Sequence, residues 1–163
     1  MRRKLFSSDE LRPLLAERQG RGEKIVFTNG CFDLLHIGHV RYLEAARAEG
    51  NCLIVALNGD DSIRRLKGEH RPLLQADQRS RVIGGLSSVD YVTFFDEDDP
   101  RELIKKLRPD VLVKGGDYEI GQVLGREEIW TWGGRVATIP VVPGSSTSAI
   151  VKKIVEQFGK DAK

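Results

Sequence analysis

The chain reads KIVFTNGCFDLLHIGH at residues 24–39. Residues 24–29 form a short apolar run of the kind found in buried strands. From Ile37 onward, apolar side chains recur at helical spacing as far as Gly50, which predicts an amphipathic helix. A strand that leads directly into a helix is the opening unit of a parallel α/β fold.

Strands and helices alternate along the rest of the chain. Apolar runs predict further strands at residues 53–57, 91–95, 111–113 and 136–139. Helices are expected at residues 5–18, 77–86, 99–107, 126–132 and 147–158, and the last one is expected to bury Ile150, Val151, Ile154, Val155 and Phe158. Residues 58–74 are polar and basic, and they predict a loop with a single helical turn.

This alternation predicts a Rossmann-like α/β fold, with a five-stranded parallel sheet and helices on both faces. We expect a single domain over residues 1–163, in which residues 1–23 form an N-terminal helical extension. Sheets of this kind bind ligands beyond the carboxyl ends of their strands. The residues that follow the predicted strands are therefore the first candidates for a site.

The composition narrows the classes of partner. Of the 163 residues, 40% are hydrophobic and 31% are charged, as is ordinary for a soluble globular protein. The net charge of +2 gives no bulk argument for binding nucleic acid or a membrane, and neither partner is expected. Cys31 and Cys52 are too few for a disulfide framework, and the basic start of the chain lacks the apolar run of a signal peptide. We therefore expect a cytoplasmic protein.

Two histidines mark the candidate site after the first predicted strand. His36 and His39 are three residues apart at the amino-terminal end of the predicted helix, where unpaired N–H groups and the helix dipole favour an anion. Gly38 between them leaves the backbone open to a close approach. The pattern predicts a phosphate site. A zinc site built from His36, His39 and Cys31 is the main alternative, and Cys31 as a nucleophile is a second one.

The same stretch carries a family motif. It reads Thr28-x-Gly30-x-Phe32-Asp33-x-x-His36-x-Gly38-His39, which resembles the signature of the nucleotidyltransferase superfamily that includes the cytidylyltransferases. The chain is further similar, over residues 24–158, to the adenylyltransferase part of the bacterial heptose kinase/adenylyltransferase, on segments that include Lys114-Gly115-Gly116-Asp117-Tyr118 and Ser146-Thr147-Ser148. Because no sugar-kinase half accompanies them, a stand-alone nucleotidyltransferase fold is expected.

The resemblance implies an activity and a set of site residues. It implies that ATP and D-glycero-β-D-manno-heptose 1-phosphate react with Mg²⁺ as cofactor to give ADP-heptose and pyrophosphate, for lipopolysaccharide or a related heptose-containing glycan. A homo-oligomer is expected. The implied catalytic residues are His36, His39 and Lys67. The implied nucleotide-binding residues are Thr28, Asn29, Gly30, Cys31, Phe32, Gly38, Arg79, Lys114, Gly115, Ser146, Thr147 and Ser148. The implied substrate-binding residues are Asp33, Asp60 and Asp117, with Mg²⁺ carried mainly by the ATP phosphates and Asp60 as its candidate ligand.

Three alternative functions stay open. The first is a cytidylyltransferase that acts on glycerol 3-phosphate or another small phosphorylated polyol. Glycerol-phosphate cytidylyltransferases typically have Arg-Tyr-Val-Asp where this chain has Ser88-Val89-Asp90, a difference that weakens this alternative. The second is a nucleotide-binding module without turnover, and the third is an interaction domain stabilised by zinc.

Overall fold

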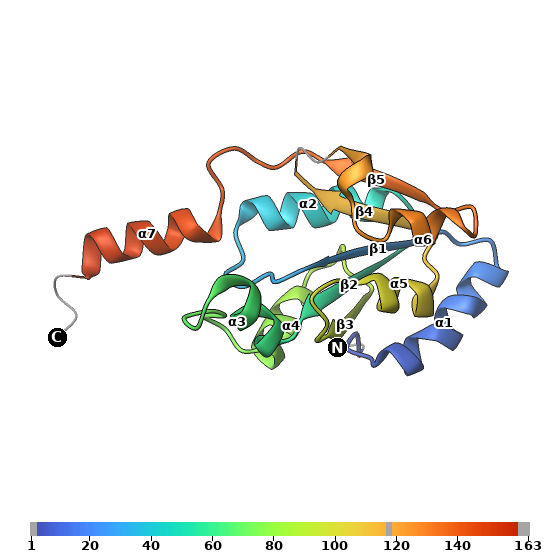
Figure 1. Ribbon diagram of the computed structural model, residues 1–163, viewed down its shortest axis with the longest axis horizontal. Coiled ribbons are helices and arrows are strands. Elements are labelled where there is room, and N and C mark those ends of the chain that lie inside the picture. The colour runs from blue at the N-terminus through green and yellow to red at the C-terminus, as the bar shows by residue number, and fades with distance from the viewer. Residues whose placement is uncertain (1–2, 117–118, 160–163) are drawn as a thin grey trace.

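Five parallel strands form the centre of the protein. The computed structural model describes residues 3–116 and 119–159. The strands are β1 (Ile25–Gly30), β2 (Cys52–Asn58), β3 (Tyr91–Phe95), β4 (Val111–Gly115) and β5 (Arg135–Ile139), in the order β3-β2-β1-β4-β5 (Figure 1). All four pairings are parallel, which confirms the predicted sheet.

Helices connect the strands. They are α1 (Ser8–Gly20), α2 (Ile37–Ala48), α3 (Asp60–Lys67), α4 (Ala76–Gly84), α5 (Arg101–Leu107), α6 (Arg126–Trp130) and α7 (Thr147–Phe158), with a short 3-10 helix η1 (Ile120–Gln122). Within the described residues, none of these helices combines the length and the apolar character needed to cross a bilayer.

Both faces of the sheet are covered. Successive strand residues point to opposite faces, and Phe27 and Val26 of β1 accordingly belong to two separate apolar clusters. The cluster around Phe27 includes residues of α1, α5 and α6, and the cluster around Val26 includes residues of α2 and α4. The continuous apolar run in β2, which is buried at every position, is explained by this double covering.

The N-terminal segment packs against the first of these layers. The α1 helix starts with a capping box, in which Ser7 and Glu10 satisfy each other's backbone N–H groups. Its Leu11 and Leu15 are fully buried in the cluster that contains Phe27. Residues 4–6 also bond to the outer edge of β3 through Val92, so this part of the edge strand is covered.

The segment after β2 forms a longer helix than predicted. The α3 helix has eight residues, whereas we expected a loop with a single turn. Two aspartates occupy its first turn and three basic residues its last, which is the order that the helix dipole favours. Ile63 is fully buried and anchors the helix. The prediction was wrong because Ile63 and Leu66 are the only apolar residues among the eight of this helix, which is too weak a pattern to predict more than one turn.

The last helix lies apart from the sheet. Figure 1 shows α7 extending away from the body of the protein, and none of its residues is buried. The predicted burial of Ile150, Val151, Ile154, Val155 and Phe158 is therefore wrong. Residues 140–146 carry the helix past the end of the sheet, so within the described chain its apolar side faces no packed layer.

Candidate active site at the carboxyl edge of the sheet

A cavity of about 520 Å³ opens where the strand order reverses between β1 and β4. In parallel sheets this reversal creates a crevice that serves as the ligand site. Most of the predicted site residues line the cavity: Asn29, Gly30, Cys31, Phe32, Asp33, His36, Gly38, His39, Lys67, Lys114, Gly115, Ser146, Thr147 and Ser148. Residues that we did not predict also line it: Tyr42, Arg71, Val141, Val142 and Ser145.

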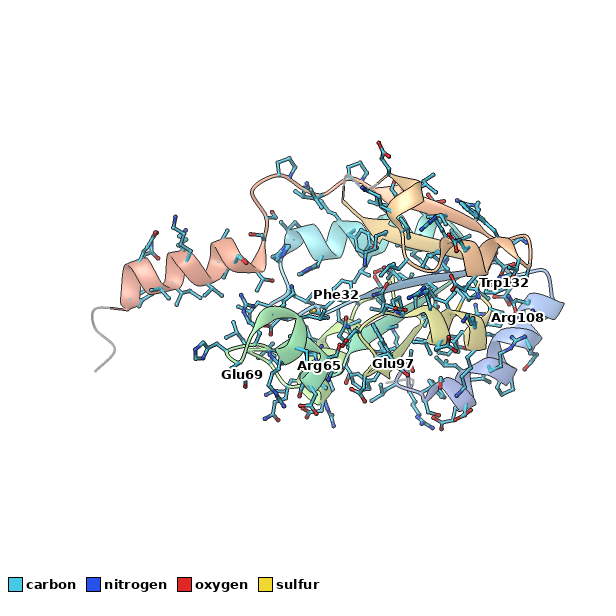
Figure 2. All side chains as sticks on the ribbon, viewed as in Figure 1. Phe32, Arg65, Glu69, Glu97, Arg108 and Trp132 are labelled. Carbon is cyan, nitrogen blue, oxygen red and sulfur yellow. The ribbon has the colours of Figure 1, made fainter. Side chains whose placement is uncertain are left out.

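The two histidines lie against each other in this cavity. His36 is the N-cap residue of α2 and His39 is in the first turn, so their rings stack with centroids 3.9 Å apart and an interplanar angle of 28°. Phe32, labelled in Figure 2, packs its ring 5.2 Å from that of His39. Among the described residues the buried Nδ1 atoms of both histidines have no hydrogen-bond partner.

Burial keeps both rings uncharged at neutral pH. It lowers the pKa of His36, and burial together with the charges of His36 and Lys67 lowers the pKa of His39 to about 4. At neutral pH the two imidazoles are therefore neutral, and each carries one N–H donor and one acceptor nitrogen. An anion placed beside them favours protonation, so a bound phosphate would raise both pKa values.

Gly38 allows the start of α2 and the segment before α7 to pack closely at the cavity. A Cβ atom on this residue would lie 2.9 Å from Nδ1 of His36 and 3.2 Å from Cβ of Ser145. The absence of a side chain therefore makes room for the His36 ring and for the segment that precedes α7. We predicted that this glycine leaves space for a ligand, and the structure shows that it also accommodates protein atoms.

Two lysines bring positive charge to the cavity. Lys67 ends α3 and Lys114 lies near the end of β4. Neither forms an ion pair with a described residue. Burial lowers the pKa of Lys114. The partly desolvated ammonium of Lys114 gains free energy from a nearby anion, and Lys67 adds an exposed positive charge, so both lysines are suited to bind phosphate oxygens.

The amino terminus of α7 closes one side of the cavity. Ser146 caps the helix by accepting a hydrogen bond from the N–H of Ala149 at 3.1 Å. The hydroxyl of Thr147 donates to the carbonyl of Leu34 at 3.0 Å, which fixes the helix start against the loop between β1 and α2. Helix amino termini present unpaired N–H groups to anions.

A family model described as cytidylyltransferase-like matches residues 27–153. The chain belongs to the cytidylyltransferase-like family. This membership confirms the predicted family and fold class, and it supports the predicted enzyme class, a nucleotidyltransferase.

Curated relatives of this cytidylyltransferase-like chain include two bacterial proteins named bifunctional protein HldE. The identity is 49% over 158 residues with HldE of Geobacter sulfurreducens, covering 97% of this chain and 32% of the relative. It is 53% over 152 residues with HldE of Ectopseudomonas mendocina, covering 93% and 32%. The chain thus spans about a third of the length of these relatives.

Solved structures share the fold. A lipopolysaccharide core biosynthesis protein from Thermoplasma volcanium matches with a TM-score of 0.61 and 26% identity, over 74% of this chain and 98% of that one. Pantothenate synthetase from Thermus thermophilus matches with a TM-score of 0.59 at 16% identity, over 86% of this chain and 62% of that one. The second likeness concerns the cytidylyltransferase-like fold alone.

Two residues predicted to bind ligands lie outside the cavity and bind protein groups instead. The guanidinium of Arg79 is fully buried and donates to the carbonyls of Leu74, Cys31 and Asn58 and to a carboxylate oxygen of Asp60. The other Asp60 oxygen accepts from the backbone N–H of the first residue of α4 at 3.2 Å. Burial and these four hydrogen bonds give Arg79 a structural position, and its predicted nucleotide contact stays a prediction.

Thr28 also lies outside the cavity, and its predicted role in nucleotide binding stays a prediction. Its side chain is fully buried, and its hydroxyl lies 2.6 Å from the hydroxyl of Tyr42. Burial raises the pKa of Tyr42 to about 12, and its hydroxyl donates to the carbonyl of Val113. Tyr42 lines the cavity in place of Thr28, and its position three residues after His39, on the same side of α2, is the signal that could have identified it.

Asp33 lines the cavity, but its carboxylate already accepts hydrogen bonds from other groups of the protein. It accepts hydrogen bonds from the backbone N–H groups of Leu73 and Leu74 and from Nη1 of Arg71. Burial raises the pKa of Asp33, but these donors outweigh that effect and hold the pKa below its ordinary value. The carboxylate is therefore ionised and holds the 71–74 segment against the end of β1.

The described residues do not provide a set of ligands for the zinc site that we considered as an alternative. Over residues 3–116 and 119–159, no three His, Cys, Asp or Glu side chains come together as metal ligands. His36 and His39 stack face to face, an arrangement that does not direct both rings to one ion. Asp117, a predicted substrate-binding residue, lies outside the described residues.

Proposed function

We propose that this cytidylyltransferase-like protein transfers AMP from ATP to D-glycero-β-D-manno-heptose 1-phosphate, giving ADP-heptose and pyrophosphate. The observation that carries the proposal is the stacked pair of His36 and His39 at the start of α2, inside a cavity that also presents two lysines with no ion-pair partner among the described residues. The similarity to HldE over nearly the whole chain supports the heptose substrate. The product would serve lipopolysaccharide or a related glycan.

The chemistry is a displacement at phosphorus. An oxygen of the sugar phosphate attacks the α-phosphorus of ATP, and the bond from this phosphorus to the oxygen that bridges it to the β-phosphate breaks. Pyrophosphate leaves with the electron pair of that bond. Because the nucleophile is already an anion, no base has to remove a proton, and catalysis depends on placing two anions together and stabilising the charge.

The residues of the cavity can supply that stabilisation. Neutral His36 and His39 donate N–H groups to phosphate oxygens, and Lys67 and Lys114 add fixed positive charge. The start of α7 offers N–H groups and the hydroxyls of residues 146–148 to the leaving pyrophosphate. In the transition state, negative charge develops on the leaving pyrophosphate while the second anion approaches the same phosphorus. These groups therefore stabilise the transition state more than they stabilise the bound substrates.

Magnesium fits this arrangement as a companion of ATP. Asp33 binds backbone N–H groups and Arg71, and Asp60 binds Arg79 and lies outside the cavity, so the described cavity residues offer the ion no uncommitted carboxylate. The ATP phosphates would therefore supply most of its ligands, and the bound ion would neutralise part of their charge. The predicted role of Asp60 as a magnesium ligand has no support from this geometry.

Pyrophosphate release tests the proposal. We expect release from ATP, Mg²⁺ and the heptose 1-phosphate, with ADP-heptose identified by mass spectrometry. His39→Ala should lower kcat by about 100-fold or more while the thermal unfolding temperature changes little, because a pre-organised donor is lost. Release only from CTP and glycerol 3-phosphate would instead identify the first alternative, a cytidylyltransferase. Nucleotide binding without any turnover would identify the non-catalytic module.

Three further expectations rest on the sequence and stay predictions. They are a cytoplasmic location, a homo-oligomeric state and a single domain over residues 1–163 with residues 1–23 as an extension. Size-exclusion chromatography with light scattering would measure the oligomeric state directly.

A further inference from the structure

Arg71 has an unexplained position in the cavity wall. Its side chain is only 20% exposed, yet its one side-chain hydrogen bond with a described residue is that from Nη1 to Oδ2 of Asp33, at 2.9 Å. A guanidinium has five N–H donors in a planar fork, so most of the donors of Arg71 are available to a ligand. Arginine held in this way is suited to the bidentate binding of a phosphate.

The surroundings of Arg71 hold it in place without occupying its donors. Asp33 is 7% exposed and binds the N–H groups of Leu73 and Leu74 as well as Arg71. One carboxylate thus fixes both the 71–74 backbone and the neighbouring guanidinium. The arginine loses little further side-chain entropy when it binds a ligand, because its position is already restricted.

The cavity residues are arranged in an order across the site. Ser145, beside the start of α7, lies against Gly38 and His36. His36 stacks on His39, and His39 is close enough to Lys67 for the lysine charge to lower its pKa. Lys67 and Arg71 come from the segments that follow β2, whereas the start of α7 follows β5, so the two groups reach the cavity from different parts of the fold.

Displacement at phosphorus requires this kind of order. The attacking and leaving oxygens lie roughly in line on opposite sides of the transferred phosphorus. With pyrophosphate at the start of α7 and the α-phosphate beside the histidines, Lys67, which is close to His39, and Arg71 are cavity cations that remain to bind the attacking phosphate. From this order and the available donors of Arg71, we infer that Arg71, held by Asp33, binds the phosphate of the acceptor. The inference rests on the proposed function and adds a residue that determines acceptor binding.

Substitution of Arg71 tests the inference, because it should weaken binding of the acceptor and leave binding of ATP unchanged. Arg71→Ala should raise the KM for the heptose 1-phosphate by about 10-fold to 100-fold, because a charge-assisted contact is lost, and leave the dissociation constant of ATP within about twofold. Arg71→Lys keeps the charge without the fork and should give an intermediate KM. Arg65→Ala is the matched control, because Arg65 (Figure 2) is exposed on α3, pairs with Asp98 and does not line the cavity.

The outcomes separate this inference from the proposed function. If Arg71→Ala weakens ATP binding as much as acceptor binding, or leaves the acceptor KM unchanged, the inference is wrong although the activity stands. If the wild type uses CTP and glycerol 3-phosphate instead, the proposed substrate is wrong, and the same KM comparison with glycerol 3-phosphate decides the role of Arg71. If calorimetry detects no binding of either phosphorylated acceptor to the wild type, both are wrong.

Discussion

The stacked histidines couple the chemistry of the site to its protonation. Two rings whose centroids are 3.9 Å apart repel each other when both are charged, and burial adds to the cost of charging either one. The pair is therefore neutral at neutral pH, and a triphosphate bound beside it would make it easier to protonate. This arrangement supplies donors to a phosphate without the desolvation cost of two buried cations.

The lowered pKa of His39 predicts a loss of stability in acid. The folded pKa is about 4 and the ordinary value is 6.5, so between these values the unfolded chain binds more protons than the folded one. The free energy of unfolding should fall as the pH is lowered from about 6.5 to about 4, and His39→Gln should make this fall shallower. Urea denaturation at a series of pH values measures it, with His70→Gln as the exposed control. An unchanged pH dependence in His39→Gln would show that the ring is not buried as described.

Gly38→Ala tests the close packing around His36. The added methyl group would lie 2.9 Å from Nδ1 of His36, so the ring has to move. We expect kcat to fall by about 100-fold with little change in the unfolding temperature, because small displacements of catalytic groups have effects of this size. Gly20→Ala is the control, since a Cβ there meets nothing within 4 Å. Wild-type turnover in Gly38→Ala would contradict the assigned role of His36.

Among the helices, α7 is exposed although its sequence pattern predicts a buried side. Its apolar residues recur at helical spacing, which usually indicates a buried side. In the structure Ile154 is 49% and Phe158 61% exposed, while the start of the same helix is fixed by Ser146 and Thr147 at the cavity. The capped start therefore has a role in the site that does not depend on burial of the rest of the helix.

The exposure of α7 predicts that its apolar residues contribute little to stability. Phe158→Ser should change the free energy of unfolding by less than about 0.5 kcal/mol, as is usual for surface positions. Leu15→Ala in α1 should cost about 2–5 kcal/mol, because that side chain is fully buried. Urea denaturation of both variants at low protein concentration makes the comparison. A large loss in Phe158→Ser would mean that α7 is covered in solution.

At the scale of the whole molecule, Arg79 connects parts of the chain that are distant in sequence. From α4 it reaches the carbonyls of Cys31 after β1 and Asn58 at the end of β2, and it pairs with Asp60 at the start of α3. The carbonyl of Cys31 belongs to the segment that lines the cavity. Arg79 therefore holds the edge of the sheet in the shape that the site requires.

Arg79→Met should lower the free energy of unfolding by about 3 kcal/mol, because it leaves buried carbonyls and Asp60 without their donor. Arg81→Met, an exposed arginine on the same helix, should stay within about 0.5 kcal/mol of the wild type. Guanidinium chloride denaturation measures both values. If Arg79→Met instead kept wild-type stability and lost only ATP affinity, the predicted nucleotide contact would be supported.

Much of the fold and of the site could be predicted because the signals are local. The apolar run in β2 and the helical spacing after Ile37 each involve neighbouring residues, and so does the three-residue separation of His36 and His39. Short-range periodicity determines which residues share a face. The order of strands and helices then places the ends of β1 and β4 at one edge of a parallel sheet.

The roles of single polar residues follow from long-range packing and could not be predicted from the sequence. Arg71 and Arg79 are near neighbours in the sequence, yet Arg79 is buried against carbonyls and Arg71 reaches the cavity beside Asp33. The short spacing of His36 and His39 was sufficient to locate the site, because it depends on one helix. The roles of Arg71, Arg79 and α7 depend on distances between segments far apart in the chain, which packing sets and local sequence does not encode.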